Sequence, residues 1–154
     1  MTGPVAATVA TGPGPASMQS ERYRPFWEGA EKGELRFPRC RGCGRFHWYP
    51  ALRCPHCSSA ALEWTAVGGE GRVFTWTVVR YPFLLEFKDR LPLIVALVEF
   101  DDAPGVRLVT NIVDARPEEM AVGVRVSPVF RRLTSGVCFP LYRPAGRPLA
   151  GAER

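Results

Sequence analysis

The sequence predicts a mainly β protein with three successive parts: a short N-terminal helix, a metal-binding ribbon and a five-stranded barrel. Three observations lead to this prediction. An amphipathic segment comes first, two Cys-x-x-Cys pairs follow it, and five short runs rich in β-branched and aromatic residues occupy the rest of the chain. We divide the chain into a disordered tail (1–20), the helix (21–36), the ribbon (37–66), the barrel domain (67–145) and a C-terminal tail (146–154).

The composition is that of an ordinary globular protein, with 46% apolar and 23% charged residues among 154. Residues 1–20 have no aromatic residue and no periodicity, so we expect a flexible tail. No run approaches the roughly 18 apolar residues that a membrane span needs, and no signal peptide is recognisable, so we expect a cytoplasmic protein without membrane contact. The net charge of +5 combines basic ends with an acidic middle, which suits an acidic partner or phosphorylated ligand better than nucleic acid.

The segment 24–35 predicts a short amphipathic helix. Pro25 suits the first turn of a helix, and the apolar residues of the segment lie near one face. We expect Gly33 to end the helix. Phe26 and Trp27, two adjacent aromatic residues on the apolar face, are either core residues or a docking surface for a partner.

Four cysteines form two pairs with metal-ligand spacing: Cys40 with Cys43, and Cys54 with Cys57. In a reducing compartment such pairs indicate a metal site rather than disulfides. Two Cys-x-x-Cys turns supply the tetrahedral set of thiolates that zinc prefers. Because the thiolates fill all four positions, no water can be activated at the ion, and we expect structural zinc. Iron in a rubredoxin-type centre is the less favoured alternative.

The residues around the cysteines fit a zinc ribbon. Gly42 and Gly44 flank Cys43, where they allow positive φ and a close approach of backbone N–H groups to sulfur. Pro55 stiffens the second turn. Residues 46–50 are interpreted as a small strand and its return.

Other candidates for chemistry are few. His47 and His56 lie in the ribbon, but four cysteines suffice, so we expect neither to bind the metal. Cys138 lies in an apolar run and is expected to be a core residue. No phosphate-binding loop, Gly-x-Ser-x-Gly motif or His-Glu-x-x-His motif is present, and a nucleophile would lack a base. We therefore expect no catalytic residue in this chain.

Five runs after the cysteines predict strands, separated by glycine-rich and acidic turns. Residues 101–105 predict a hairpin between the second and third strands, and residues 116–120 predict a helical turn after the third. Five antiparallel strands with such an insertion are typical of an OB-type barrel, and an SH3-like barrel is the alternative. The predicted strands are 72–81, 93–100, 106–112, 124–130 and 137–142.

Several motifs in this order resemble the DUF35 family over residues 21–145. They are Arg24 to Gly29 (RPFWEG), Leu35 to Gly44 (LRFPRCRGCG), Cys54 to Cys57 (CPHC) and Gly71 to Val79 (GRVFTWTVV). The resemblance implies an N-terminal helix, a rubredoxin-like zinc ribbon and a C-terminal OB-fold that binds acyl-CoA or partners an acyl-CoA enzyme. Family members act beside thiolase-like proteins, in thiolase, acyltransferase or steroid side-chain aldolase complexes whose partner subunit holds the catalytic residues.

The loop 81–92 supports a role in binding, because it joins the first two strands with large apolar residues between prolines. These side chains either cover the barrel end, line an acyl channel or bury in another subunit. Arginines on or beside the strands are candidates for the phosphates of CoA. The candidate acyl-CoA or partner contacts are Phe83, Leu84, Leu85, Phe87, Arg72, Arg80, Arg125, Arg131 and Arg132.

The sequence thus predicts a non-catalytic accessory subunit of an acyl-CoA-processing complex, with acyl-CoA as ligand and a thiolase-like or lipid-transfer-like enzyme as partner. One alternative is a single-stranded nucleic-acid-binding protein in which Phe74, Trp76 and Arg80 form a stacking face. A self-sufficient acyl-CoA enzyme or thioesterase is a further alternative, which the missing base disfavours.

Overall fold

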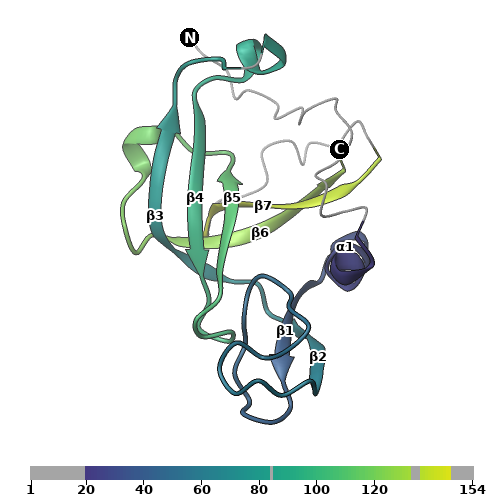
Figure 1. Cartoon of the computed structure of the whole chain (residues 1–154). Coiled ribbons are helices and arrows are strands. Elements are labelled where there is room, and N and C mark those ends of the chain that lie inside the picture. The colour runs from purple at the N-terminus through teal and green to yellow at the C-terminus, as the bar shows by residue number, and fades with distance from the viewer. Residues whose placement is uncertain (1–19, 84, 133–135, 147–154) are drawn as a thin grey trace.

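The computed structural model of the chain describes residues 20–83, 85–132 and 136–146. A closed β-barrel stands beside a smaller two-stranded ribbon, and one α-helix packs where the two meet (Figure 1). The predicted mainly β architecture is confirmed. None of the helices formed by the described residues is long and apolar enough to cross a bilayer. Residues 1–19 and 147–154 of the expected tails lie outside the described part.

The N-terminal helix begins after a short 3₁₀ turn, η2 (Glu21–Tyr23), in which the backbone N–H of Arg22 donates to the Ser20 hydroxyl. The helix α1 (Arg24–Glu31) carries a proline in its first turn. It ends two residues before Gly33, which adopts φ +71° as expected of a helix-terminating glycine. The sequence placed Leu35 on the helix face, but this residue begins the next strand.

The ribbon contains strands that the sequence analysis missed. Strand β1 (Leu35–Cys40) pairs antiparallel with β2 (Leu62–Val67), and both cysteine loops lie between them. The expected small strand at 46–50 is wrong. Phe46 forms a single bridge to β1, after which Trp48 turns inward and packs its ring 4.9 Å from that of Phe26. Trp48 is half-buried in this packing, and the chain continues after the bridge as a loop rather than a strand.

Five strands close into the barrel in the order β3-β4-β5-β7-β6, with β6 returning to β3. They are β3 (Gly71–Val79), β4 (Leu93–Glu99), β5 (Arg107–Ile112), β6 (Arg125–Arg132) and β7 (Cys138–Pro144). The predicted helical turn is the 3₁₀ helix η4 (Pro117–Glu119), between β5 and β6. Together these features identify an OB-fold rather than an SH3-like barrel.

One strand pairing differs from the prediction of five antiparallel strands. Strands β5 and β7 pair in parallel, through Ile112 and Tyr142, whereas the other neighbouring pairs are antiparallel. Two parallel strands need a crossover connection, and here η4 and β6 lie between them in the chain. The parallel pair therefore closes the barrel.

Ribbon, helix and barrel share one apolar core. Phe37 of β1 is fully buried and lies 5.2 Å, between ring centroids, from Phe100 at the end of β4. Phe26 of α1 is also buried and packs near Phe37. Cys138 of β7 is buried, as predicted for a core cysteine. The metal-binding part is therefore not an independent appendage.

A short connection, residues 68–70, joins the ribbon to the barrel and is held by three hydrogen bonds. The N–H of Gly68 donates to the Asp102 carboxylate (2.5 Å). The carbonyl of Gly69 accepts from the buried Tyr142 hydroxyl (2.9 Å). The carboxylate of Glu70 accepts from the Ser127 hydroxyl (2.9 Å). We call this segment the neck. These bonds leave the neck little freedom to bend.

Candidate metal centre and interaction surfaces

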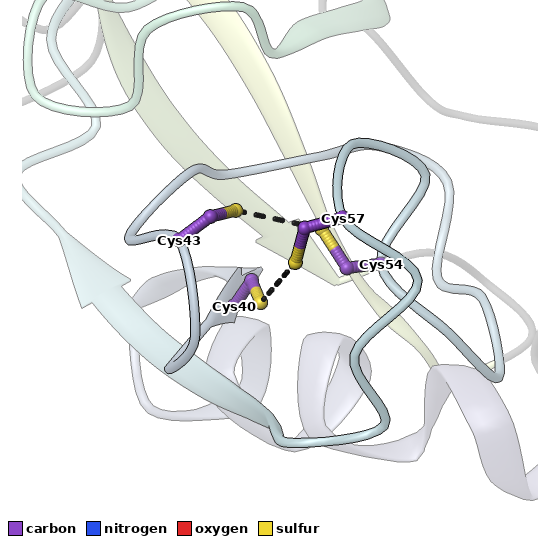
Figure 2. Close-up of side chains that lie close together, drawn as sticks. All are labelled: Cys40, Cys43, Cys54 and Cys57. Carbon is purple, nitrogen blue, oxygen red and sulfur yellow. Dashed lines mark hydrogen bonds between the residues drawn. The ribbon is translucent and has the colours of Figure 1, made fainter.

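The four cysteine side chains of the ribbon converge from two loops (Figure 2). The sulfurs of Cys40 and Cys57 lie 3.6 Å apart, those of Cys43 and Cys54 lie 3.7 Å apart, and all four fall within 4.8 Å of one another. A tetrahedral zinc ion with bonds of about 2.3 Å requires sulfurs about 3.8 Å apart. The donor set and its spacing therefore fit the expected ion.

The two loops repeat one backbone geometry. The N–H of Gly44 donates to the carbonyl of Cys40 (2.8 Å), and the N–H of Ser58 donates to the carbonyl of Cys54 (2.9 Å). Gly44 has φ +74° and Ser58 has φ +61°, so the residue after the second cysteine is left-handed in both loops. The expected positive φ of Gly44 is confirmed, and Ser58 adopts it despite carrying a side chain.

Gly42 serves the site through its small size. A Cβ atom at this position would lie 3.5 Å from the Cys40 sulfur and 3.3 Å from the side chain of Ser59. Unlike Gly44, it does not adopt a positive φ. The close approach predicted at Gly42 is therefore confirmed, whereas a positive φ there is not.

Without metal, the thiols of Cys40 and Cys57 differ in pKa. The N–H of Cys43 donates to the Cys40 sulfur and is the main reason that the Cys40 pKa falls to about 6. The N–H of Ser59 lowers the Cys57 pKa, but the sulfur of Cys40 and burial outweigh it and raise that pKa to about 12. One proton thus leaves Cys40 readily, while another is retained on Cys57. Metal binding must displace the retained protons.

Neither histidine belongs to the sulfur cluster. His47 is buried, its backbone N–H donates to the Pro38 carbonyl (3.1 Å), and burial lowers the pKa of its ring. The ring of His56 lies 3.5 Å from the Arg45 guanidinium. That neither histidine binds the metal stays a prediction.

The loop between β3 and β4 exposes a group of apolar side chains. Tyr81, Phe83 and Leu85 are 67%, 82% and 85% exposed, and the first two rings meet edge to face at 5.2 Å. The 3₁₀ helix η3 (Leu85–Arg90) follows, at the end of the barrel away from the ribbon (Figure 1). We call these three residues the apolar tip. Because most of the surface of each side chain is exposed, these residues are available to another molecule.

Two further residues proposed for this loop behave differently. Phe87 is half-buried, and the Arg90 guanidinium lies over its ring at 5.9 Å from the centroid. Leu84 lies outside the described residues.

Most of the arginines proposed for CoA phosphates already have carboxylate partners. The pairs are Arg72 and Arg125 with Asp101, Arg131 with Asp114, and Arg132 with Glu31. An arginine neutralised in this way attracts a phosphate less strongly. Arg80 is exposed, adjoins the apolar tip in sequence and forms no ion pair with the described residues.

The expected nucleic-acid stacking face is not open. The Arg107 guanidinium lies over the Phe74 ring, 3.6 Å from its centroid, and Trp76 packs against the core. A base would have to displace Arg107 before it could stack on Phe74. The three residues of this hypothesis therefore do not form a free platform.

Phe26 and Trp27 are not both available as projecting anchors. Phe26 is 3% exposed, and Trp27 is half-buried with its ring 5.6 Å from that of Phe139. Their packing attaches α1 to the ribbon and to β7. Sequence reasoning missed the nearby exposed residues Tyr49 and Val109, because single exposed apolar residues carry no periodic signal.

The fold and the four-cysteine cluster define a zinc-ribbon protein with an OB-fold domain. Family models match both parts: residues 27–63 match the model described as "ChsH2, rubredoxin-like zinc ribbon domain" and residues 64–131 match "ChsH2, C-terminal OB-fold domain". A "DUF35 domain-containing scaffold protein" of Methanothermobacter thermautotrophicus is 32% identical over 75% of this chain and 86% of its own length. The chain belongs to the DUF35 family.

Other relatives are similar to this chain over different shares of their length. A "Probable enoyl-CoA hydratase alpha subunit" of Thermomonospora curvata is 33% identical over 80% of this chain, which spans only 38% of that protein. A chain of the solved structure "Ltp2-ChsH2(DUF35) aldolase" is 29% identical, with a TM-score of 0.73 over 82% of this chain and 96% of that one. A DUF35 protein from Sulfolobus solfataricus, 17% identical with a TM-score of 0.59, shares the fold.

Proposed function

We propose that this chain is a non-catalytic accessory subunit that docks on a thiolase-like enzyme of acyl-CoA metabolism. The apolar tip carries the proposal, because Tyr81, Phe83 and Leu85 expose most of their surface to water and contact between subunits would bury it. The names of the relatives support it: several are scaffold proteins, and one solved relative is an aldolase named for two components, Ltp2 and ChsH2(DUF35).

The four cysteines are proposed to bind one structural zinc ion. With four thiolates as ligands, the ion has no open position for a water or substrate. When bound, it cross-links the two loops between β1 and β2 and holds the ribbon as a firm surface beside the barrel. Elemental analysis of protein purified without added metal should find one zinc per chain. A stoichiometric iron content would identify the rubredoxin-type alternative instead.

Docking is tested by co-purifying the chain with a thiolase-like protein of the same organism. The double variant Phe83→Ser, Leu85→Ser should lose most of the recovered partner, because it removes two exposed apolar side chains without touching the core. Val122→Ser is the matched control, since Val122 is 72% exposed elsewhere on the barrel. Equal recovery with both variants would contradict a docking role for the tip. No recovery with the unaltered chain would contradict the proposed function.

Acyl-CoA is proposed to bind at the assembled interface, with Arg80 as the phosphate contact on this chain. Arg80 is the candidate arginine without an ion pair among the described residues, and it lies next to the apolar tip in sequence. In calorimetry on the complex, Arg80→Ala should weaken acyl-CoA binding several-fold, while Arg125→Ala should have little effect, because Arg125 shares Asp101 with Arg72. Equal effects would argue against a special role for Arg80.

Filter binding at low and moderate salt tests the nucleic-acid alternative. A single-stranded nucleic-acid binder would lose affinity steeply as salt rises, because phosphate contacts release counterions. We expect no such binding.

A further inference from the structure

An open cavity of about 160 Å³ lies between α1, the loop after β1, and strands β5 and β7. None of the described residues that line it has a charged side chain. Leu108, Val109 and Pro140 contribute aliphatic surface, and aromatic rings form the remainder. The aromatic residues are Tyr23, Phe26, Trp27, Trp48, Tyr49 and Phe139.

The aromatic side chains that line the cavity pack against one another. The ring of Phe26 lies 4.9 Å from those of both Trp27 and Trp48, and Tyr49 stacks on Trp48 at 5.1 Å. Trp27 in turn contacts Phe139 of β7. Because Phe26 belongs to the buried core, the floor of the cavity is continuous with the packed interior of the molecule. The cavity is therefore preformed.

The rim of the cavity is exposed and apolar. Tyr49 is 58% exposed and Val109 is 49% exposed. Leu52, three residues beyond Tyr49 in the same loop, is 77% exposed. An apolar opening of this kind adds contact area around whatever enters the cavity.

We propose that this cavity is a socket for one aromatic or branched aliphatic side chain projecting from a partner protein. Size supports this occupant, because a cavity of about 150 Å³ holds one benzene ring, whereas small-molecule sites typically measure about 300–1,000 Å³. Charge supports it as well, since no lining group could pair with an ionised ligand. Aromatic pockets that receive one anchor from the partner are typical interface hot spots.

The proposal rests on the proposed function in that it supplies a second contact for the same accessory subunit. It also revises the role of Phe26 and Trp27. They do not project into the partner; they form the floor and wall that receive a partner's side chain.

The socket can be tested on the full chain alone with three blocked tripeptides: Ac-Ala-Phe-Ala-NH₂, Ac-Ala-Leu-Ala-NH₂ and Ac-Ala-Lys-Ala-NH₂. Indole N–H resonances provide the signal. Trp27 and Trp48 line the cavity, whereas Trp64 and Trp76 do not and serve as internal references. The Phe and Leu peptides should shift the first pair only, and the Lys peptide should shift neither. Shifts by all three peptides, or by none, would overturn the proposal.

Two variants sharpen the test. Val109→Phe places a larger side chain at the rim from an exposed strand position and should weaken binding of the Phe peptide about tenfold. Val122→Phe, at an exposed position that does not line the cavity, should leave it unchanged. Benzyl alcohol competes for the same space; binding as tight as that of the Phe peptide would indicate a small-molecule pocket and overturn the proposal.

Co-purification separates this inference from the proposed function. If Val109→Phe lowers recovery of the thiolase-like partner and Val122→Phe does not, the socket belongs to that interface. If the unaltered chain binds the Phe peptide but recovers no partner, the proposed function fails while the socket stands. Recovery that is insensitive to Val109→Phe would overturn the socket as a contact with this partner.

Discussion

At the scale of single residues, Ser58 adopts the backbone conformation for which the first cysteine loop uses Gly44. Holding a non-glycine residue in the left-handed region costs about 1–3 kcal/mol of folding free energy. Replacement by Gly removes this strain, but part of the gain is offset because Gly loses more conformational entropy on folding. Ser58→Gly should therefore stabilise the metal-loaded protein by up to about 1 kcal/mol, as measured by denaturant unfolding. The backbone hydrogen bond from this residue to the carbonyl of Cys54 is preserved.

Asp114 provides the control, because it also has a positive φ (54°) but uses its carboxylate to bind Arg131. Asp114→Gly should bring no gain. A gain from Asp114→Gly and none from Ser58→Gly would show that backbone strain is not the dominant effect.

Tyr142 makes the buried hydrogen bond of the neck, and burial raises the pKa of its hydroxyl above the ordinary range. Tyr142→Phe leaves the buried Gly69 carbonyl without a donor, which should cost about 1–3 kcal/mol of unfolding free energy. Tyr81→Phe is the control, since Tyr81 is exposed and its replacement should cost nothing measurable. An equal loss in both variants would contradict the assigned role of the hydrogen bond.

At the scale of elements, one carboxylate attaches α1 to the barrel. Glu31, at the end of α1, accepts hydrogen bonds from the Arg132 guanidinium of β6 and from the N–H of Cys138 of β7 (3.0 Å). The bond from Arg132 is the main reason that the Glu31 pKa lies below its ordinary value of 4.5. Because α1 contributes two residues to the cavity lining, Phe26 and Trp27, this attachment also holds the socket.

The lowered pKa of Glu31 makes the stabilisation from this attachment depend on pH. The stabilisation is fully present above the unfolded-state pKa, near 4.5, and is lost as pH falls through the folded-state pKa. Glu31→Gln should therefore be less stable than the unaltered chain by a constant amount above this pH, and the difference should shrink below it. Both proteins keep the cysteines, so metal loss in acid cancels in the difference.

Glu28→Gln is the matched control. Glu28 lies on the same helix, is exposed and pairs with Arg24 of α1. Its replacement should change the unfolding free energy little, because an exposed ion pair within one helix contributes little. A pH-independent difference for Glu31→Gln would contradict the assigned role of its carboxylate.

Sequence reasoning succeeded where the signal is local. The cysteine pairs, the glycine that ends α1 and the five barrel strands each depend on residues a few positions apart. It failed where distant residues decide. Leu35 joins a strand because residues 62–67 pair with it, and Arg132 is neutralised by Glu31 across the chain. The parallel pairing of β5 with β7 is likewise set by closure of the barrel rather than by either strand alone.

At the scale of the whole molecule, the shared core couples the metal to the barrel. Removing the ion releases the loops between β1 and β2, and Phe37 of β1 packs against Phe100 beside β4. We therefore expect chelation to lower the melting temperature of the entire protein in a single calorimetric transition. A barrel transition that stays at its original temperature after metal removal would show that the two parts unfold independently.

Retention of the metal should also depend on pH. Zinc binds thiolates, so protons compete for Cys57 and its neighbours as pH falls. Zinc release, followed with a chromogenic chelator, should increase as the solution is acidified. Release that is independent of pH would argue against thiolate ligation.

The neck has one further mechanical consequence. Three hydrogen bonds fasten residues 68–70 to the barrel and restrict swinging of the ribbon about this connection. A protein that holds the ribbon in a given orientation thereby also sets the orientation of the loop between β3 and β4 at the opposite end (Figure 1), which carries the apolar tip. Two neighbours bound at the two ends would accordingly be kept at a constant angle and separation.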